Sequence, residues 1–140
     1  MTQQQDTLVT VSSRRVPVRS RLNTLPRHFG RLMMVVEHAV MDAMGELASA
    51  YQGGYWEFYE LSNGGFYMAP TSPERFTLLS QGSGNEGELS ADAAGIVACL
   101  FAINRVWGTY QTDDLANHYH WLLAFAREHA EWNAIAHIID

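Results

Sequence analysis

Apolar residues recur at intervals of three and four in several stretches of the chain, which is the spacing of one face of an α-helix. The first stretch predicts a helix from about residue 31 to 51, ended by the glycine pair 53–54. A second helix follows a cap at Thr112 or Asp113, and a short helix lies near the end of the chain. Their apolar stripes are Leu32, Val35, Val36, Ala39, Val40, Ala43 and Leu47; Leu115, Tyr119, Leu122, Leu123 and Ala126; and Trp132, Ile135, Ala136 and Ile139.

One more helix is expected to lie in the middle of the core. Ser90 is a suitable N-cap, and Asp92 in the first turn suits the positive end of the helix dipole. From residue 93 to 102 the helix is apolar on every side. A helix without a polar face must be covered all around, so the other elements should pack against it.

The segment between these helices has the pattern of β-strands. Strands are predicted at about 55–61, 65–69 and 75–80, with a further short strand near 86–89. Asn63 and Gly64 supply the positive φ angles of a tight hairpin turn, and connections this short join antiparallel neighbours. The predicted fold class is α+β, with a small antiparallel sheet of three or four strands packed against about four helices in a single compact domain.

Composition places the chain among ordinary soluble domains. It has 140 residues, of which 47% are hydrophobic and 17% are charged. No run of eighteen apolar residues is present, so no membrane span is expected. Residues 1–10 lack the basic and apolar regions of a secretory signal, and the single cysteine excludes an internal disulfide. We therefore expect a cytoplasmic protein in which Cys99, flanked by apolar residues, is a buried and unreactive thiol.

Charge is distributed unevenly along the chain. The formal net charge is −6, and all nine cationic residues are arginine. Residues 1–31 hold six arginines and one acid, whereas the remainder holds three arginines and fourteen acids. The six are Arg14, Arg15, Arg19, Arg21, Arg27 and Arg31. An acidic body repels phosphate chains, so the basic arm contacts DNA, an acidic protein or its own body, of which the last is favoured.

The domain boundary is expected at the end of this arm. Residues 1–21 are predicted to be a flexible leader that contains arginine, and residues 22–140 to be the folded domain. If the arm binds DNA, the arginines that do so should be Arg14, Arg15, Arg19 and Arg21.

A glycine motif and a group of histidines invite a cofactor or a metal. Residues 82–87 match the G-x-G-x-x-G pattern, but the next helix begins only near Ser90, so a mobile loop is favoured over a nucleotide site. His118 and His120 would project about 200° apart on one helix and cannot chelate one ion. Together with His129 and His137 they are expected to be surface or capping residues. We therefore expect no catalytic, cofactor or metal site.

Two corners of the chain combine residue types that a structural role does not fully explain. Arg27, His28 and Phe29 crowd a cation, a titratable ring and an aromatic ring before a helix, and an apolar pair at the other end leads to Asp140. The structural alternatives are a hydrophobic staple with a surface arginine for the first, and a packed helix end with a solvated tail for the second. The aromatic and glycine-rich block 51–70 offers no evident acid–base, nucleophilic or metal chemistry. The protein should thus act by contact, and the expected interaction surface comprises Arg27, His28, Asn63, Gly64, Gly65 and Asp140.

The same segments resemble the ArdB/KlcA family of antirestriction proteins over about residues 22–140. The matching stretches are Pro26–Gly30; the pattern Tyr-x-Gly-Gly-x-Trp-x-Phe-Tyr-x-Leu-Ser-Asn-Gly-Gly-Phe-Tyr-Met-Ala-Pro, which runs from Tyr51 to Pro70; Ala93–Ile96 with Cys99–Leu100; His118–Tyr119; and Ile138–Asp140. The central block is long and specific, whereas the others are short.

The resemblance implies a mixed α/β domain that inhibits host type I restriction–modification enzymes and so protects incoming DNA of mobile elements. It implies a partner that is the restriction enzyme or an accessory factor, and a mechanism other than DNA mimicry. Two other functions stay open: a small DNA-binding protein that uses the basic arm, and a hydrolase that uses a His–Asp pair.

Overall fold

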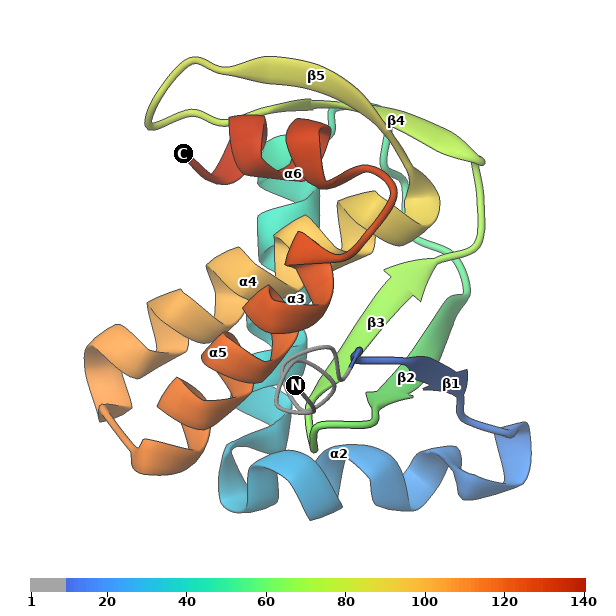
Figure 1. The fold of residues 1–140 in the computed structure, drawn as a ribbon, viewed down its shortest axis with the longest axis vertical. Helices are drawn as coiled ribbons and strands as arrows, with labels where there is room; N and C mark the ends of the chain where they lie inside the picture. The colour runs from blue at the N-terminus through green and yellow to red at the C-terminus, as the bar shows by residue number, and fades with distance from the viewer. Residues whose placement is uncertain (1–9) are drawn as a thin grey trace, which may run out of the picture.

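The computed structural model describes residues 10–140, which form five α-helices, two short 3₁₀ helices and five strands (Figure 1). In the N-terminal half these are β1 (Ser13–Arg15), η1 (Val18–Ser20), α2 (Arg21–Phe29), η2 (Gly30–Leu32), α3 (Met33–Leu47), β2 (Trp56–Leu61) and β3 (Phe66–Pro70). In the C-terminal half they are β4 (Arg75–Leu79), β5 (Glu86–Ser90), α4 (Ala91–Tyr110), α5 (Asp113–Arg127) and α6 (Trp132–Ile139). The predicted α+β class is confirmed.

The strands form two small antiparallel sheets. One has the order β1-β2-β3, and the other is the β4–β5 hairpin. The expected pairing of β4 with the strand before it is wrong, because Phe76, Leu78 and Leu89 give the hairpin its own buried face. This hairpin packs over α4 and α6 at the far end of the molecule from α2 (Figure 1).

Helix α4 is the centre of the core, as predicted. Ser90 caps it by accepting a hydrogen bond from the backbone N–H of Ala93 at 3.1 Å. The helix is long and apolar enough to cross a membrane, but most of it is buried inside the fold, as expected of a core helix. Cys99 lies in this helix, and burial raises the pKa of its thiol to about 12.

The N-terminal segment departs most from the sequence-based expectations. β1 lies within the predicted leader and pairs with β2, and the segment before the first predicted helix is itself a helix, α2, despite Pro26. Thr24, Leu25 and Phe29 of α2 are buried, so tertiary packing outweighs the local helix-breaking signals. Of the predicted leader, residues 1–9 lie outside the described residues.

Candidate interaction surface

The side chain of Glu60, on β2, joins three elements of the fold. Antiparallel pairing places Arg14 of β1 opposite Glu60, and the Arg14 guanidinium donates to Oε1 at 2.9 Å. From α2, the Arg27 guanidinium donates to Oε2, which also lies 3.1 Å from Nε2 of His28. One carboxylate thus holds α2 and β1 against β2.

Glu57 plays a similar part on the opposite face of β2. It pairs with Arg15 at 3.4 Å and with Arg21 at 3.8 Å. The Arg21 guanidinium also lies 4.0 Å from the centre of the Phe58 ring and 4.9 Å from that of Tyr55, in cation–π contacts. Four of the six arginines of the basic arm therefore contact the protein's own body, as the favoured interpretation of the charge pattern predicts.

His28 and His118 meet where α2 packs on α5. Their ring centres are 5.1 Å apart, within an aromatic cluster completed by Phe29, Phe66 and Trp121. His118 is only 3% exposed, and its Nδ1 has no hydrogen-bond partner. The expectation that His118 is a surface or capping residue is wrong, because the aromatic cluster covers its ring.

The environment of both imidazoles disfavours their protonated forms. Burial, the neighbouring His118 and the positive Arg27 lower the pKa of His28 to about 4. Burial also lowers the pKa of His118, against weaker opposing effects of the His28 backbone and Asp114. Both rings are therefore neutral at neutral pH.

Acidification should destabilise the fold through these two residues. Below the ordinary histidine pKa of 6.5, the unfolded chain takes up protons that His28 and His118 in the folded chain do not. The free energy of unfolding should fall as the pH drops below about 6.5, for His28 down to about pH 4, by at most about 1.4 kcal/mol per pH unit for each histidine and less after solvent screening. His118→Phe should reduce the difference between urea denaturation at pH 7 and at pH 5. His120→Phe, on the exposed side of α5, should leave that difference unchanged, and equal behaviour of the two variants would contradict the prediction.

The hairpin turn between β2 and β3 is attached to α5. The Asn63 side chain donates to the backbone carbonyl of Trp121 at 3.0 Å and accepts from the N–H of Gly65 at 3.0 Å. Gly64 has a φ of +103° and lies against the Trp121 ring. A Cβ on Gly65 would lie 2.9 Å from the Trp121 Cβ and 3.0 Å from a Leu61 methyl carbon. The two glycines are thus needed for the turn and its close packing.

Five of the six residues predicted to form an interaction surface lie in this region. His28 is linked to the turn of Asn63, Gly64 and Gly65 through His118 and Trp121, and Arg27 shares the Glu60 carboxylate with His28. The sixth is apart from them: Asp140 is exposed at the end of α6, beside the β4–β5 hairpin, where the Asn85 side chain donates to the carbonyl of His137 at 2.9 Å (Figure 1).

The structure contains a His–Asp pair, of His129 and Asp92. The Asp92 carboxylate accepts from Nε2 of His129 at 2.9 Å and from the buried Tyr67 hydroxyl at 2.7 Å. Nδ1 of His129 accepts from the N–H of Glu131 at 3.0 Å. The bond to Asp92 raises the pKa of His129. Because both ring nitrogens are occupied, neither can take a proton from a nucleophile, which argues against the hydrolase interpretation.

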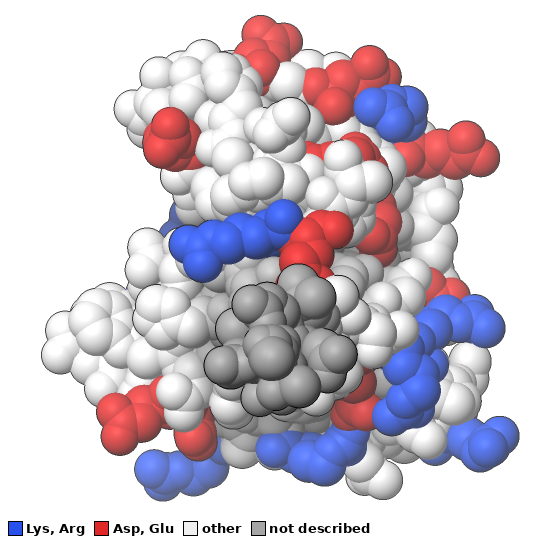
Figure 2. Space-filling view, viewed as in Figure 1, with Lys and Arg blue, Asp and Glu red and all other residues white. Residues whose placement is uncertain are grey.

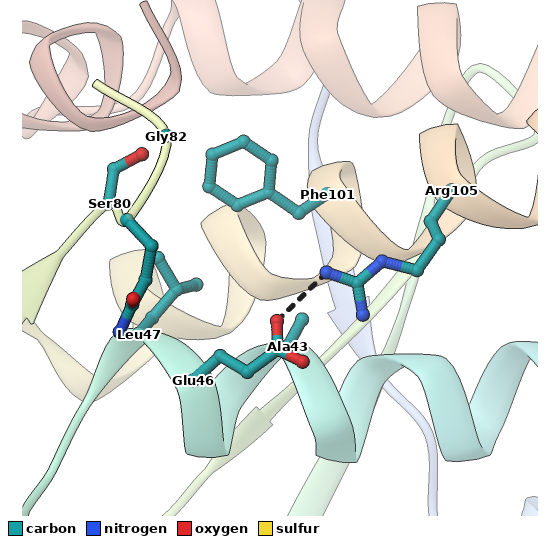
Figure 3. Close-up of a pocket in the computed structure, with 8 residues that line it drawn as sticks. Ala43, Glu46, Leu47, Ser80, Gly82, Phe101 and Arg105 are labelled. Atoms are coloured by element: carbon teal, nitrogen blue, oxygen red, sulfur yellow. Dashed lines mark hydrogen bonds and ion pairs between the residues drawn. The ribbon is translucent and has the colours of Figure 1, made fainter. Parts of the chain in front are cut away.

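The glycine motif forms the turn of the β4–β5 hairpin and one wall of a cleft against α3 and α4. The cleft has a volume of about 200 Å³, and an ion pair of Glu46 and Arg105, 2.9 Å long, spans it beside Phe101 (Figure 3). Small-molecule sites usually have volumes of about 300–1,000 Å³, so this cleft is smaller than a usual small-molecule site. Among residues 10–140, no three His, Cys, Asp or Glu side chains are grouped to hold a metal ion.

Glu57, Glu60 and Trp121 belong to this region but were not predicted from the sequence. The alternation of β2 does place Glu57 and Glu60 on opposite faces, and that signal was available. Their arginine partners were not identifiable, because Arg14 and Glu60 lie 46 residues apart and the strand that aligns them is only three residues long.

Comparison with known proteins identifies the family. A model of the antirestriction protein family matches residues 49–140. Two Escherichia coli proteins named antirestriction protein KlcA are 51% and 47% identical to the chain. The alignments cover 90% and 97% of this chain and 91% and 98% of the relatives.

A solved structure has the same fold. It matches with a TM-score of 0.87 and 45% identity over 93% of this chain and 95% of its own. That work describes, for KlcA and ArdB, a novel fold and antirestriction activity against type I DNA restriction systems in vivo but not in vitro. The family model and the full-length likeness agree, and this chain belongs to the KlcA/ArdB family of antirestriction proteins.

Proposed function

We propose that this protein inhibits host type I restriction–modification systems in the cytoplasm, and so protects the DNA of an incoming mobile element. The observation that carries the proposal is the match to KlcA and ArdB over nearly the whole chain, since those proteins act against type I systems in vivo. Their lack of activity in vitro favours a mechanism that needs a further cellular factor. The protein would then act on restriction through an accessory partner rather than by blocking the purified enzyme.

The proposed mechanism is binding, without catalysis and without DNA mimicry. A DNA mimic needs a dense negative surface, because duplex DNA carries one charge per about 1.7 Å of its axis. This chain has a net charge of only −6. Its basic side chains gather along the lower edge of the molecule in Figure 2, over α2 and β1, while acidic side chains prevail in the upper half. Such a polarised surface supports recognition of a protein partner.

The binding region that we propose is built around Glu60, the histidine pair and the β2–β3 turn. Arg27 and His28, together with Asn63, Gly64 and Gly65, belong to one continuous part of the fold, held by packing and hydrogen bonds. Asp140 would have to contact the partner separately, because it lies at the end of α6 beside the β4–β5 hairpin. DNA binding by the arm is the weaker alternative, because Glu57 and Glu60 neutralise much of its charge.

The proposed function should appear as rescue of unmodified phage on a restricting host. Cells that carry a type I system and express the protein should plate unmodified phage nearly as well as a host without restriction, whereas an empty vector should not. A host with a type II enzyme is the matched control and should gain nothing. Equal plating with and without the gene across several type I systems would contradict the proposal. Adding purified protein to a purified type I enzyme would show whether the contact is direct.

A further inference from the structure

The two most exposed large apolar side chains among the described residues are neighbours. Leu22 is 90% exposed and Val18 is 74% exposed, one helical turn apart on η1 and the start of α2. Pro26, another turn along, is exposed too. These residues form an apolar row on the outer side of α2 that no other described element covers.

A row of polar residues runs beside the apolar row. Arg19, Asn23 and Arg27 recur at every fourth residue, so they share one side of the helix. With Arg14 they line a hollow of about 380 Å³ whose wall includes Glu60. Among the described residues Arg19 makes no ion pair, while Arg14 and Arg27 remain 70% and 54% exposed although they contact Glu60. An arginine has five N–H donors, so donors remain for a ligand.

From this arrangement we propose that the two rows, here called the α2 ridge, dock an acidic segment of a partner protein that carries an apolar side chain among its carboxylates. The carboxylates would enter the hollow between Arg14, Arg19 and Arg27, and the apolar side chain would cover Leu22 and Val18. Glu60 holds two of the arginines in place before the partner arrives, which lowers the entropy cost of binding. In the cell, this inference rests on the proposed function, because the partner would be the factor through which restriction is inhibited.

The chemistry of the ridge favours a protein over a nucleic acid. The exposed aliphatic side chains of Leu22 and Val18 gain nothing from a phosphate backbone, whereas an apolar side chain of a protein segment can cover them. A protein segment can bind both rows at once, because its apolar side chain can bury Leu22 while its carboxylates pair with Arg19.

A peptide titration tests the ridge without knowledge of the natural partner. The full-length protein, labelled with ¹⁵N, is titrated with a synthetic peptide in which Asp and Glu alternate with Leu and Phe. Shifts should be confined to amides of residues 14–27, and Leu22→Ser or Arg19→Glu should weaken binding about tenfold. Leu79→Ser and Arg127→Glu are the matched controls elsewhere on the surface and should bind as the wild type does.

Other occupants of the ridge would give different results. The same peptide with Lys in place of Asp and Glu should cause no shifts. A 20-base-pair DNA duplex that shifts residues 14–27 when the acidic peptide does not would overturn the proposal in favour of nucleic acid. Concentration-dependent shifts of those amides without peptide would overturn it in favour of a second copy of the chain. No shifts with any probe would also overturn it.

The plating assay separates this inference from the proposed function. Leu22→Glu should abolish protection of unmodified phage, while Leu79→Glu should retain it, with thermal unfolding showing that both variants are folded. If wild type and both variants protect equally, the ridge is not the docking site although the proposed function stands. If the wild type itself does not protect, the proposed function fails, and the peptide titration still decides whether the ridge binds acidic segments.

Discussion

Replacing Gly95 by alanine is expected to destabilise the protein by about 3 kcal/mol or more, a large part of the stability of a domain this size. Gly95 lies on the side of α4 that packs directly on β3. An added Cβ would lie 2.4 Å from the Cβ of Ala69, and 2.5 Å from the Ala69 Cα and the carbonyl oxygen of Met68. Two of these atoms belong to the backbone, so no rotamer change relieves the overlap, and the central helix must move away from the sheet.

Gly108→Ala is the matched control in the same helix. Nothing lies within 4 Å of a Cβ built on Gly108, so alanine should stabilise the protein by about 0.5–1 kcal/mol through its higher helix propensity. Urea denaturation followed by circular dichroism measures both changes. A Gly95→Ala variant with wild-type stability would show that α4 and β3 are not packed as closely as described.

Replacing Phe66 by alanine is expected to cost about 3–5 kcal/mol, the usual range for a buried phenylalanine. Phe66 is 2% exposed, and its ring contacts His28 and Phe29 of α2 and Phe58 of β2. Truncation leaves a cavity where α2 meets the sheet. Because η1 and α2 together carry both rows of the α2 ridge, any Phe66→Ala protein that still folds should also bind the acidic peptide less well.

Two other substitutions show whether the loss comes from the cavity. Phe66→Leu keeps most of the volume and should cost much less than Phe66→Ala. Tyr110→Ala removes an aromatic ring that is 47% exposed at the end of α4 and should change the free energy of unfolding little. Chemical denaturation of the three variants under one condition is the measurement. A small loss for Phe66→Ala would mean that α2 is held mainly by its ion pairs with β2.

The sequence predicted well those features that depend on neighbouring residues. Apolar residues on every side of 93–102 led to a buried central helix, and Ser90 and Thr112 are the caps of α4 and α5. Trp56 and Phe58 alternate with polar residues in the predicted strand 55–61, and both are buried in the core. Each of these features depends on residues that lie a few positions apart along the chain, so the spacing of residue types is enough to predict it.

The region around Glu60 was predictable only in part. Arg27 and His28 were identified from their residue types, but the helix α2 that carries them was not predicted, because the first predicted helix begins only at about residue 31. Burial of His118 was also missed, because a polar residue in an amphipathic helix is normally assigned to the solvent side. Its ring is covered by Phe29 and by Trp121, and only one of these belongs to the same helix.

Local periodicity and the aromatic block sufficed to predict the α+β class, the central helix and the hairpin turn, because each depends on residue types at short spacing. Tertiary structure alone decided that the strands form two sheets, that the basic arm pairs with β2, and that Asp140 lies apart from the α2 ridge. These outcomes depend on contacts between residues far apart in the chain. Several strand faces and several pairs of opposite charges are compatible with the sequence, and the packing of the whole molecule decides which of them come into contact.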